Sequence, residues 1–175
     1  MSEDLSYPVG RFEWDGDQTG ARRERLIGEM ADAPGHLRRA VEGLSDAQLD
    51  TPYRPGGWTV RQVIHHLPDS HMNGLMRVKL ALTEDTPTIK PYDEAGFARL
   101  ADARDTPNEV SLALLDALHT RWVVLWRSLS ETDYARAFTH PELGVVPLDK
   151  QLALYAWHGR HHVAHITRLR ERMGW

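Results

Sequence analysis

The sequence predicts an all-α protein, a four-helix bundle with long connections between the helices. Four long segments carry apolar residues at the three- and four-residue spacing of amphipathic helices, and alternating strand-like patterns are scarce. The 175 residues fit a single domain, residues 1–175, long enough to bury a core. The hydrophobic share of 41% and the charged share of 26% are ordinary for a soluble globular protein.

The first part of the chain is predicted to be an extended arm followed by a long helix. Pro8 and Gly10 interrupt any helix in the arm, which reaches about Asp17. The first helix spans about residues 19–44, and Pro34 should kink or divide it because proline removes a helical hydrogen bond. A short turn capped by a serine and the loop TPYRPGGW then lead to the second helix.

The second helix is capped by Thr59 and is expected to reach about Thr83. It contains two adjacent histidines, His65 and His66, which point to different sides of a helix. At most one of them can therefore share a partner with another helix. The helical wheel favours His66, but a bend at Pro68 could rotate both side chains, so the choice between them stays open.

The remaining segments alternate between long connections and helices. Residues 84–107 are too interrupted for a long helix and are expected to form a loop with a short turn at about 93–100. The third helix spans about residues 108–129. The stretch ARAFTHPELGVVPLD, residues 135–149, suits a small hairpin before the last helix, which spans about 149–172.

Four histidines gather in LYAWHGRHHVAHI, residues 154–166 of the last helix. At about 100° per residue, His162 points toward the core, His158 lies beside it and His161 lies furthest out. The four-residue spacing of His158 and His162 puts two imidazoles on one face, where a helix can chelate one metal ion. The alternative is a pair of histidines that are hydrogen-bonded at the edge of a core, and a third ligand from elsewhere would decide.

Two other histidines are interpreted as structural. His71 falls within the apolar stripe of the second helix. His119 lies beside the apolar seam of the third helix and is expected to be a rim residue rather than a ligand.

The composition excludes several function classes. The chain has no cysteine, so a metal must be held by His, Asp or Glu, and any thiol chemistry needs an external thiol. The net charge of −4 predicts no general attraction to nucleic acid. No long apolar run or apolar targeting segment is present, so we expect a cytoplasmic protein that does not enter membranes. Phosphate-binding glycine loops and a Ser/His/Asp order are also absent, which argues against a nucleotide enzyme or a metal-free hydrolase.

A family resemblance rests on four strings taken together, WTVRQVIHHLPDSHMN, LALTEDTPTIKPYDE, LHTRW and LYAWHGRHHVAHI. They resemble the YfiT-like branch of the DinB superfamily, a group of metal-dependent four-helix bundles, over almost the whole chain. The resemblance implies one divalent metal ion per chain, most simply zinc or nickel, held by one histidine of the second helix and two of the fourth. The matching positions are His66, His158 and His162.

The resemblance also implies an activity. Three neutral imidazoles leave coordination positions open, which is the arrangement of a catalytic metal site. Relatives are interpreted as bacillithiol-dependent S-transferases or as metal-dependent hydrolases, and as homodimers. We favour transfer of a small-molecule thiol to an electrophilic substrate; hydrolysis by activated water and a non-catalytic bundle with a structural metal are the alternatives. No catalytic residue is assigned, but several polar residues are expected near the metal: Gln62, Asn73, Arg77, Tyr155 and Arg160.

Overall fold

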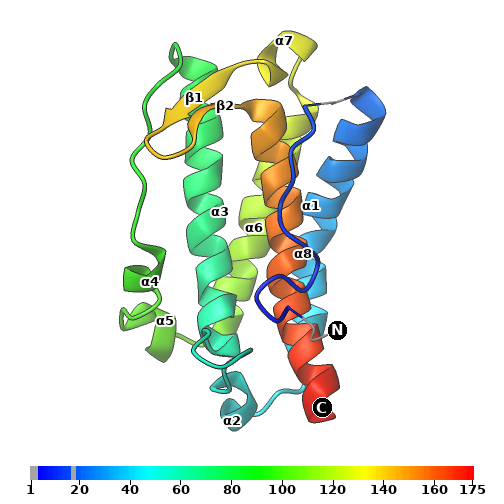
Figure 1. The fold of residues 1–175 in the computed structure, drawn as a ribbon, viewed down its shortest axis with the longest axis vertical. Helices are drawn as coiled ribbons and strands as arrows, with labels where there is room; N and C mark the ends of the chain where they lie inside the picture. Colours follow the sequence, from blue (N-terminus) through cyan, green and yellow to red (C-terminus); the bar gives the residue numbers. More distant parts are fainter. Residues whose placement is uncertain (1–3, 17–18) are drawn as a thin grey trace.

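Four long helices form the body of the protein in the computed structural model, which describes residues 4–16 and 19–175 (Figure 1). They are α1 (Gly20–Val41), α3 (Val60–Thr83), α6 (Asn108–Arg127) and α8 (Leu148–Met173). The predicted four-helix bundle is confirmed, with boundaries displaced by at most three residues. Neither Pro34 in α1 nor Pro68 in α3 divides its helix.

Local signals explain where the helices begin. The Thr19 side chain accepts a hydrogen bond from the backbone N–H of Arg22 at the start of α1. Thr59 and Gln62 form a reciprocal capping box at the start of α3, and Ser45 forms a similar one for the short helix α2 (Asp46–Leu49). The predicted caps of both elements are therefore present.

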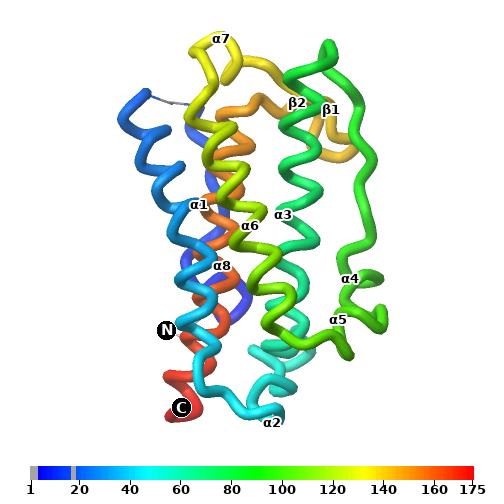
Figure 2. Tube along the Cα trace, turned by 180° about the vertical axis from the view of Figure 1, so that it is seen from behind, coloured from blue at the N-terminus to red at the C-terminus, as the bar shows by residue number. Residues whose placement is uncertain are grey.

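The connection after α3 is long because of the helix directions. Figures 1 and 2 show α1 and α8 running one way and α3 and α6 the other. A chain that leaves α3 must return along about 36 Å of helix before α6 can begin. The returning segment contains only the short helices α4 (Glu94–Phe97) and α5 (Asp102–Asp105).

A small hairpin closes one end of the bundle, as predicted (Figure 2). Strands β1 (Ala137–His140) and β2 (Gly144–Pro147) are antiparallel, with Phe138 opposite Val146. Both of these side chains are buried. The short helix α7 (Glu131–Tyr134) precedes the hairpin and was not predicted.

The bundle core consists of two apolar clusters along its length. One cluster surrounds Trp122 and Trp126, and the other surrounds Leu37 and Ile64. Histidines occupy the level between them. On α3, His71 lies between Leu67 of one cluster and Leu75 of the other. The equivalent level holds His119 on α6 and the four histidines of residues 158–165 on α8. A polar layer therefore crosses an otherwise apolar core.

The N-terminal arm runs beside α8 (Figure 1). The Trp157 indole donates a hydrogen bond to the Gly10 carbonyl oxygen at 3.2 Å, and Phe12 packs near the same indole. The predicted end of the arm at Asp17 lies outside the described residues. Among the helices of residues 4–16 and 19–175, none is long and apolar enough to cross a membrane.

Candidate metal centre

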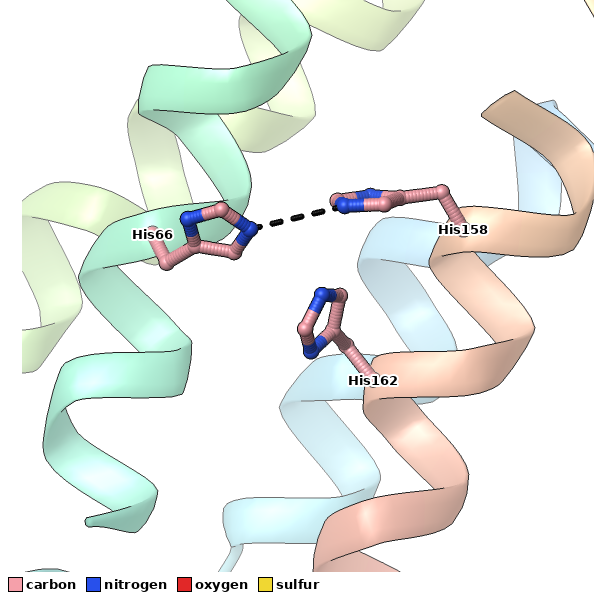
Figure 3. A group of neighbouring side chains, drawn as sticks. All are labelled: His66, His158 and His162. Atoms are coloured by element: carbon pink, nitrogen blue, oxygen red, sulfur yellow. Dashed lines mark hydrogen bonds between the residues drawn. The ribbon is translucent and has the colours of Figure 1, made fainter. Parts of the chain in front are cut away.

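Three histidines from α3 and α8 converge between the two helices (Figure 3). One ring nitrogen from each of His66, His158 and His162 lies within 4.8 Å of the other two. The Nε2 atoms of His66 and His158 are 3.4 Å apart, the contact drawn as a dashed line in Figure 3. Helix α3 thus brings a third imidazole, that of His66, to His158 and His162, whose four-residue spacing suggested that they chelate a metal ion.

The neighbouring His65 points elsewhere. Its Nδ1 atom is hydrogen-bonded to the Ser111 hydroxyl of α6 at 2.7 Å. Because α3 continues without a break through Pro68, His66 remains directed toward α8. The structure therefore places His66, and not His65, with His158 and His162.

The electrostatic environment keeps these imidazoles neutral at pH 7. Burial lowers the pKa of His66 to about 4. Burial, followed by the proximity of neighbouring histidines, also lowers the pKa of His158 and of His162 well below the ordinary value. A neutral imidazole has a lone pair on one nitrogen, which is the form that binds a metal ion.

The donor set fits a divalent ion. Two nitrogen ligands about 2.05 Å from a tetrahedral zinc ion would be about 3.3 Å apart, close to the observed Nε2 separation of 3.4 Å. That separation is long for a hydrogen bond. One ring nitrogen of His162 points toward the same space, whereas its Nδ1 atom, which is buried without a hydrogen-bond partner, points away (Figure 3). Three ring nitrogens that converge at this spacing are what a metal position requires.

A cavity of about 460 Å³ opens beside the three histidines. Its walls come from the N-terminal arm, the loop between α2 and α3, α4 and α8. The lining residues are Tyr7, Tyr53, Arg54, Gly56, Gly57, Trp58, His66, Glu94, Trp157, His158, His161, His162 and His165. A substrate in this cavity would lie directly against the three converging rings.

The sequence model of the DinB superfamily matches residues 29–166, which include all three histidines and all four long helices in whole or in part. The chain belongs to the DinB superfamily. It is 54% identical over 173 residues to a protein of Bacillus mycoides named "Putative metal-dependent hydrolase", and the match covers 99% of each chain. A protein of Oceanobacillus iheyensis with the same designation is 53% identical over 169 residues, 97% of this chain and 98% of that one.

A solved DinB-like structure has the same fold. YfiT from Bacillus subtilis superposes with a TM-score of 0.96 at 48% identity, and the match covers 98% of both chains. It is described as "a probable metal-dependent hydrolase with an unusual four-helix bundle topology". The resemblance to the YfiT-like branch is therefore confirmed.

In this DinB bundle, His161 and His165 form a second group on the cavity side, which we name the outer pair. His165 stacks on Tyr53 at 3.9 Å between ring centroids, and His161 stacks on Trp157 at 4.4 Å. Both Nδ1 atoms are buried without a hydrogen-bond partner. His161 is not simply furthest out, because the arm that carries Tyr7 covers it and leaves the residue 7% exposed.

His71 and His119 form a third group on the core side of His158, which we name the inner chain. His71 Nε2 lies 3.0 Å from His158 Nδ1, and His71 Nδ1 lies 2.6 Å from His119 Nε2. His119 Nδ1 lies 2.6 Å from the Met30 carbonyl oxygen. Burial lowers the pKa of both His71 and His119, so both rings are neutral at pH 7.

The interpretation of His119 as a rim residue is wrong, since it is 1% exposed. It follows Leu115 by four positions and precedes Trp122 by three, and both of these are fully buried. That spacing was the signal that could have placed it in the core. His71 is fully buried, as its position in the apolar stripe indicated.

Of the five polar residues expected near the metal, Tyr155 lies beside the site, with its ring centroid 5.7 Å from that of His158, and the other four are not among the described residues that line the cavity. The Tyr155 hydroxyl donates to the Ser70 carbonyl oxygen, Gln62 caps α3, and Arg160 pairs with Glu29. Asn73 bonds the backbone of its own helix, and neither it nor Arg77 is among the described residues that line the cavity. Sequence reasoning instead missed the aromatic and arginine side chains of the arm and the α2–α3 loop, because only the fold brings them to α8.

Proposed function

We propose that this chain is a metal-dependent enzyme that joins a small-molecule thiol to an electrophilic substrate, with a divalent ion held by His66, His158 and His162. The observation that carries the proposal is the convergence of three neutral imidazoles beside a cavity of about 460 Å³. When bound, an ion with open positions lowers the pKa of a thiol or a water that it contacts. We take the ion to be zinc or nickel and the working form to be a cytoplasmic homodimer.

The cavity walls suit an acidic thiol of the bacillithiol type. The chain has no cysteine, so the sulfur must come from outside. Arg54 offers a positive charge, and His161 and His165 offer ring nitrogens, all on the wall beside His162. These groups can bind the anionic part of the thiol and leave its sulfur directed toward the three histidines.

The electrophile would bind against the aromatic wall. Trp58 lies 4.5 Å from His66 between ring centroids, and Trp157 stacks on His161. Indole rings pack favourably against flat apolar groups. The arm and the α2–α3 loop also limit the access of water to that space, which protects an activated thiol from competing hydrolysis.

Hydrolysis is the second candidate, and two observations favour it. The relatives from Bacillus mycoides and Oceanobacillus iheyensis carry hydrolase names. Glu94 also lies on the cavity wall, where a carboxylate can take a proton from an attacking water. In this case the same three histidines would hold the ion, and no thiol would be needed.

The two activities separate in one assay. Protein purified without a nickel column is measured for metal content by mass spectrometry, then incubated with a chlorinated aromatic electrophile or an aryl ester, with and without a thiol panel. We expect one divalent ion per chain and turnover of the electrophile only when a thiol is present. Thiol-independent ester cleavage that falls in Glu94→Gln would support hydrolysis instead.

Two variants test whether metal binding and turnover depend on the three-histidine site. His162→Ala should lose both the ion and turnover, whereas the exposed His36→Ala should keep both. A metal-free wild-type protein, or a His162→Ala variant with full metal content and activity, would contradict the proposal.

A further inference from the structure

The two nitrogens of His158 face opposite environments. Its Nε2 atom faces His66 at 3.4 Å, and its Nδ1 atom faces the inner chain, 3.0 Å from His71 Nε2. A neutral imidazole carries its proton on only one of these atoms. The position of that proton decides whether the lone pair points toward the candidate metal position or away from it.

The far end of the inner chain fixes the direction of every hydrogen bond in it. The Met30 carbonyl oxygen can only accept, so His119 Nδ1 must donate to it. The neutral His119 then has a bare Nε2, which accepts from His71 Nδ1. His71 in turn has a bare Nε2, which accepts from His158 Nδ1. The proton of His158 is thus on Nδ1, and its Nε2 is bare.

Pro34 explains why the Met30 carbonyl is available. Inside an α-helix, the carbonyl of residue 30 normally accepts from the N–H of residue 34. Residue 34 of α1 is proline, which has no N–H to donate. The Met30 carbonyl oxygen is left without its usual helical donor, and His119 Nδ1 lies 2.6 Å from it.

We propose that His71 and His119 are positioning residues that hold His158 in the tautomer whose Nε2 can bind the ion, through hydrogen bonds that all run toward the Met30 carbonyl. The inference rests on the metal centre of the proposed function. With its Nε2 used for coordination, His158 has no free nitrogen to accept a proton from a substrate. The inner chain therefore orients a ligand and does not carry protons from the reaction.

The surroundings keep the inner chain in one arrangement. The residues His71 and His119 are 0% and 1% exposed, so water cannot replace their partners. The Tyr155 and Trp122 rings meet His71 edge-on, at 4.9 and 5.9 Å between centroids. Residues that orient histidine ligands commonly change metal affinity by about 10- to 100-fold when they are replaced.

The first test reads the tautomers directly in metal-free protein. Long-range ¹H–¹⁵N correlation spectra at pH 7 should show His158, His71 and His119 each protonated at Nδ1, with signals assigned from single variants. A proton on Nε2 of His158 or His119 would overturn the proposal. Because this measurement needs no metal, it stays informative even if the wild-type chain binds none and the proposed function fails.

The second test compares two replacements of His119. Gln can donate to the Met30 carbonyl and accept from His71, whereas Leu can do neither. We expect His119→Leu to raise the zinc dissociation constant by about 10- to 100-fold and to give a mixture of the two His158 tautomers. His119→Gln should keep most of the zinc affinity and most of the Nδ1-protonated tautomer of His158. His140→Leu, which removes a buried histidine of β1 outside the inner chain, serves as the control and should leave zinc binding unchanged.

Circular dichroism establishes that each variant is folded before zinc is titrated. If folded His119→Leu binds zinc as tightly as the wild type with His158 in its original tautomer, His119 only fills space and the proposal is wrong. The same conclusion follows if Gln and Leu weaken zinc binding equally while the tautomer of His158 stays unchanged.

Discussion

The inner chain and the outer pair are both made of buried histidines beside the candidate metal position, but their nitrogens are used differently. In the inner chain, each nitrogen of His71 and His119 lies within hydrogen-bonding distance of a partner. In the outer pair, the buried Nδ1 atoms of His161 and His165 have no hydrogen-bond partner, and both residues line the cavity. Identical side chains thus have both nitrogens partnered on the core side and an unpartnered nitrogen on the cavity side.

This difference follows from what packs around each group. Residues of all four long helices contact the inner chain, and its terminal acceptor is the Met30 carbonyl oxygen of α1, which Pro34 leaves without a helical donor. The outer pair is contacted by Tyr53 of the α2–α3 loop, by Trp157 of its own helix and by the N-terminal arm, which makes one long contact of 3.3 Å between the Ser6 carbonyl oxygen and His165 Nε2. A satisfied, dry network specifies one geometry, whereas unpartnered nitrogens mark the place where a ligand can bind.

The largest effect should come from acid, which charges both groups in the metal-free protein. Burial lowers the pKa of His161 and of His165 to about 4, and burial together with neighbouring histidines lowers the pKa of His71 well below its ordinary value. Between about pH 6.5 and pH 4 the unfolded chain binds more protons than the folded one. The free energy of unfolding should therefore fall as the pH falls, by up to about 1.4 kcal/mol per pH unit for each such histidine.

Urea unfolding at a series of pH values measures this slope. NMR titration should also show His161 and His165 gaining their protons near pH 4 rather than near pH 6.5. Constant stability from pH 7 to pH 4.5, or protonation of His161 and His165 near pH 6.5, would contradict this prediction.

The next largest effect distinguishes two candidate metal sites, the one formed by His66, His158 and His162 and one formed by His162 with the outer pair. His162 could instead join the outer pair, since one nitrogen of each of these three histidines also lies within 4.8 Å of the others. His66→Ala should weaken zinc binding by more than about 100-fold, because losing a ligand costs more than losing a residue that orients one. His165→Phe, which keeps a ring stacked on Tyr53, should leave zinc binding unchanged.

Competition with a chromogenic chelator gives both zinc dissociation constants. The reverse outcome, with zinc lost in His165→Phe and kept in His66→Ala, would move the metal to the outer pair.

A third prediction disturbs the packing against the inner chain. A Cβ atom at Gly74 would lie 2.4 Å from the Tyr155 ring and 2.6 Å from the Trp122 ring, and both rings contact His71. Gly74→Ala should therefore destabilise the fold by about 1–3 kcal/mol, even though alanine favours helix. Gly28→Ala has open space and should instead stabilise by up to about 1 kcal/mol.

Thermal and urea unfolding of the two alanine variants make a matched comparison. Equal stabilities would mean that the rings beside the inner chain can move freely, contrary to a single fixed geometry.

The smallest effect concerns the cosubstrate. His161→Phe keeps a ring on Trp157 but removes both ring nitrogens of a residue that lines the cavity. Losing one hydrogen bond to a charged group should raise the KM for the thiol by about tenfold, with zinc content unchanged. Steady-state kinetics over a range of thiol concentrations measures it, and an unaltered KM would remove the outer pair from thiol binding.

Much of this protein could be predicted from local sequence. The long helices, the caps at Ser45 and Thr59, and the hairpin all depend on residues a few positions apart. The same holds for His158 and His162, because a four-residue spacing fixes their common face at about 100° per residue. Such features need no knowledge of the rest of the chain.

Only the tertiary structure decided which other parts of the chain those residues contact. It turned His66 rather than His65 toward α8, buried His119, and joined it to a carbonyl that Pro34 leaves without a helical donor. It also brought the arm and the α2–α3 loop over the outer pair. The physical reason is that the rotation and depth of each helix are set by close packing against three others, which no spacing within one helix encodes.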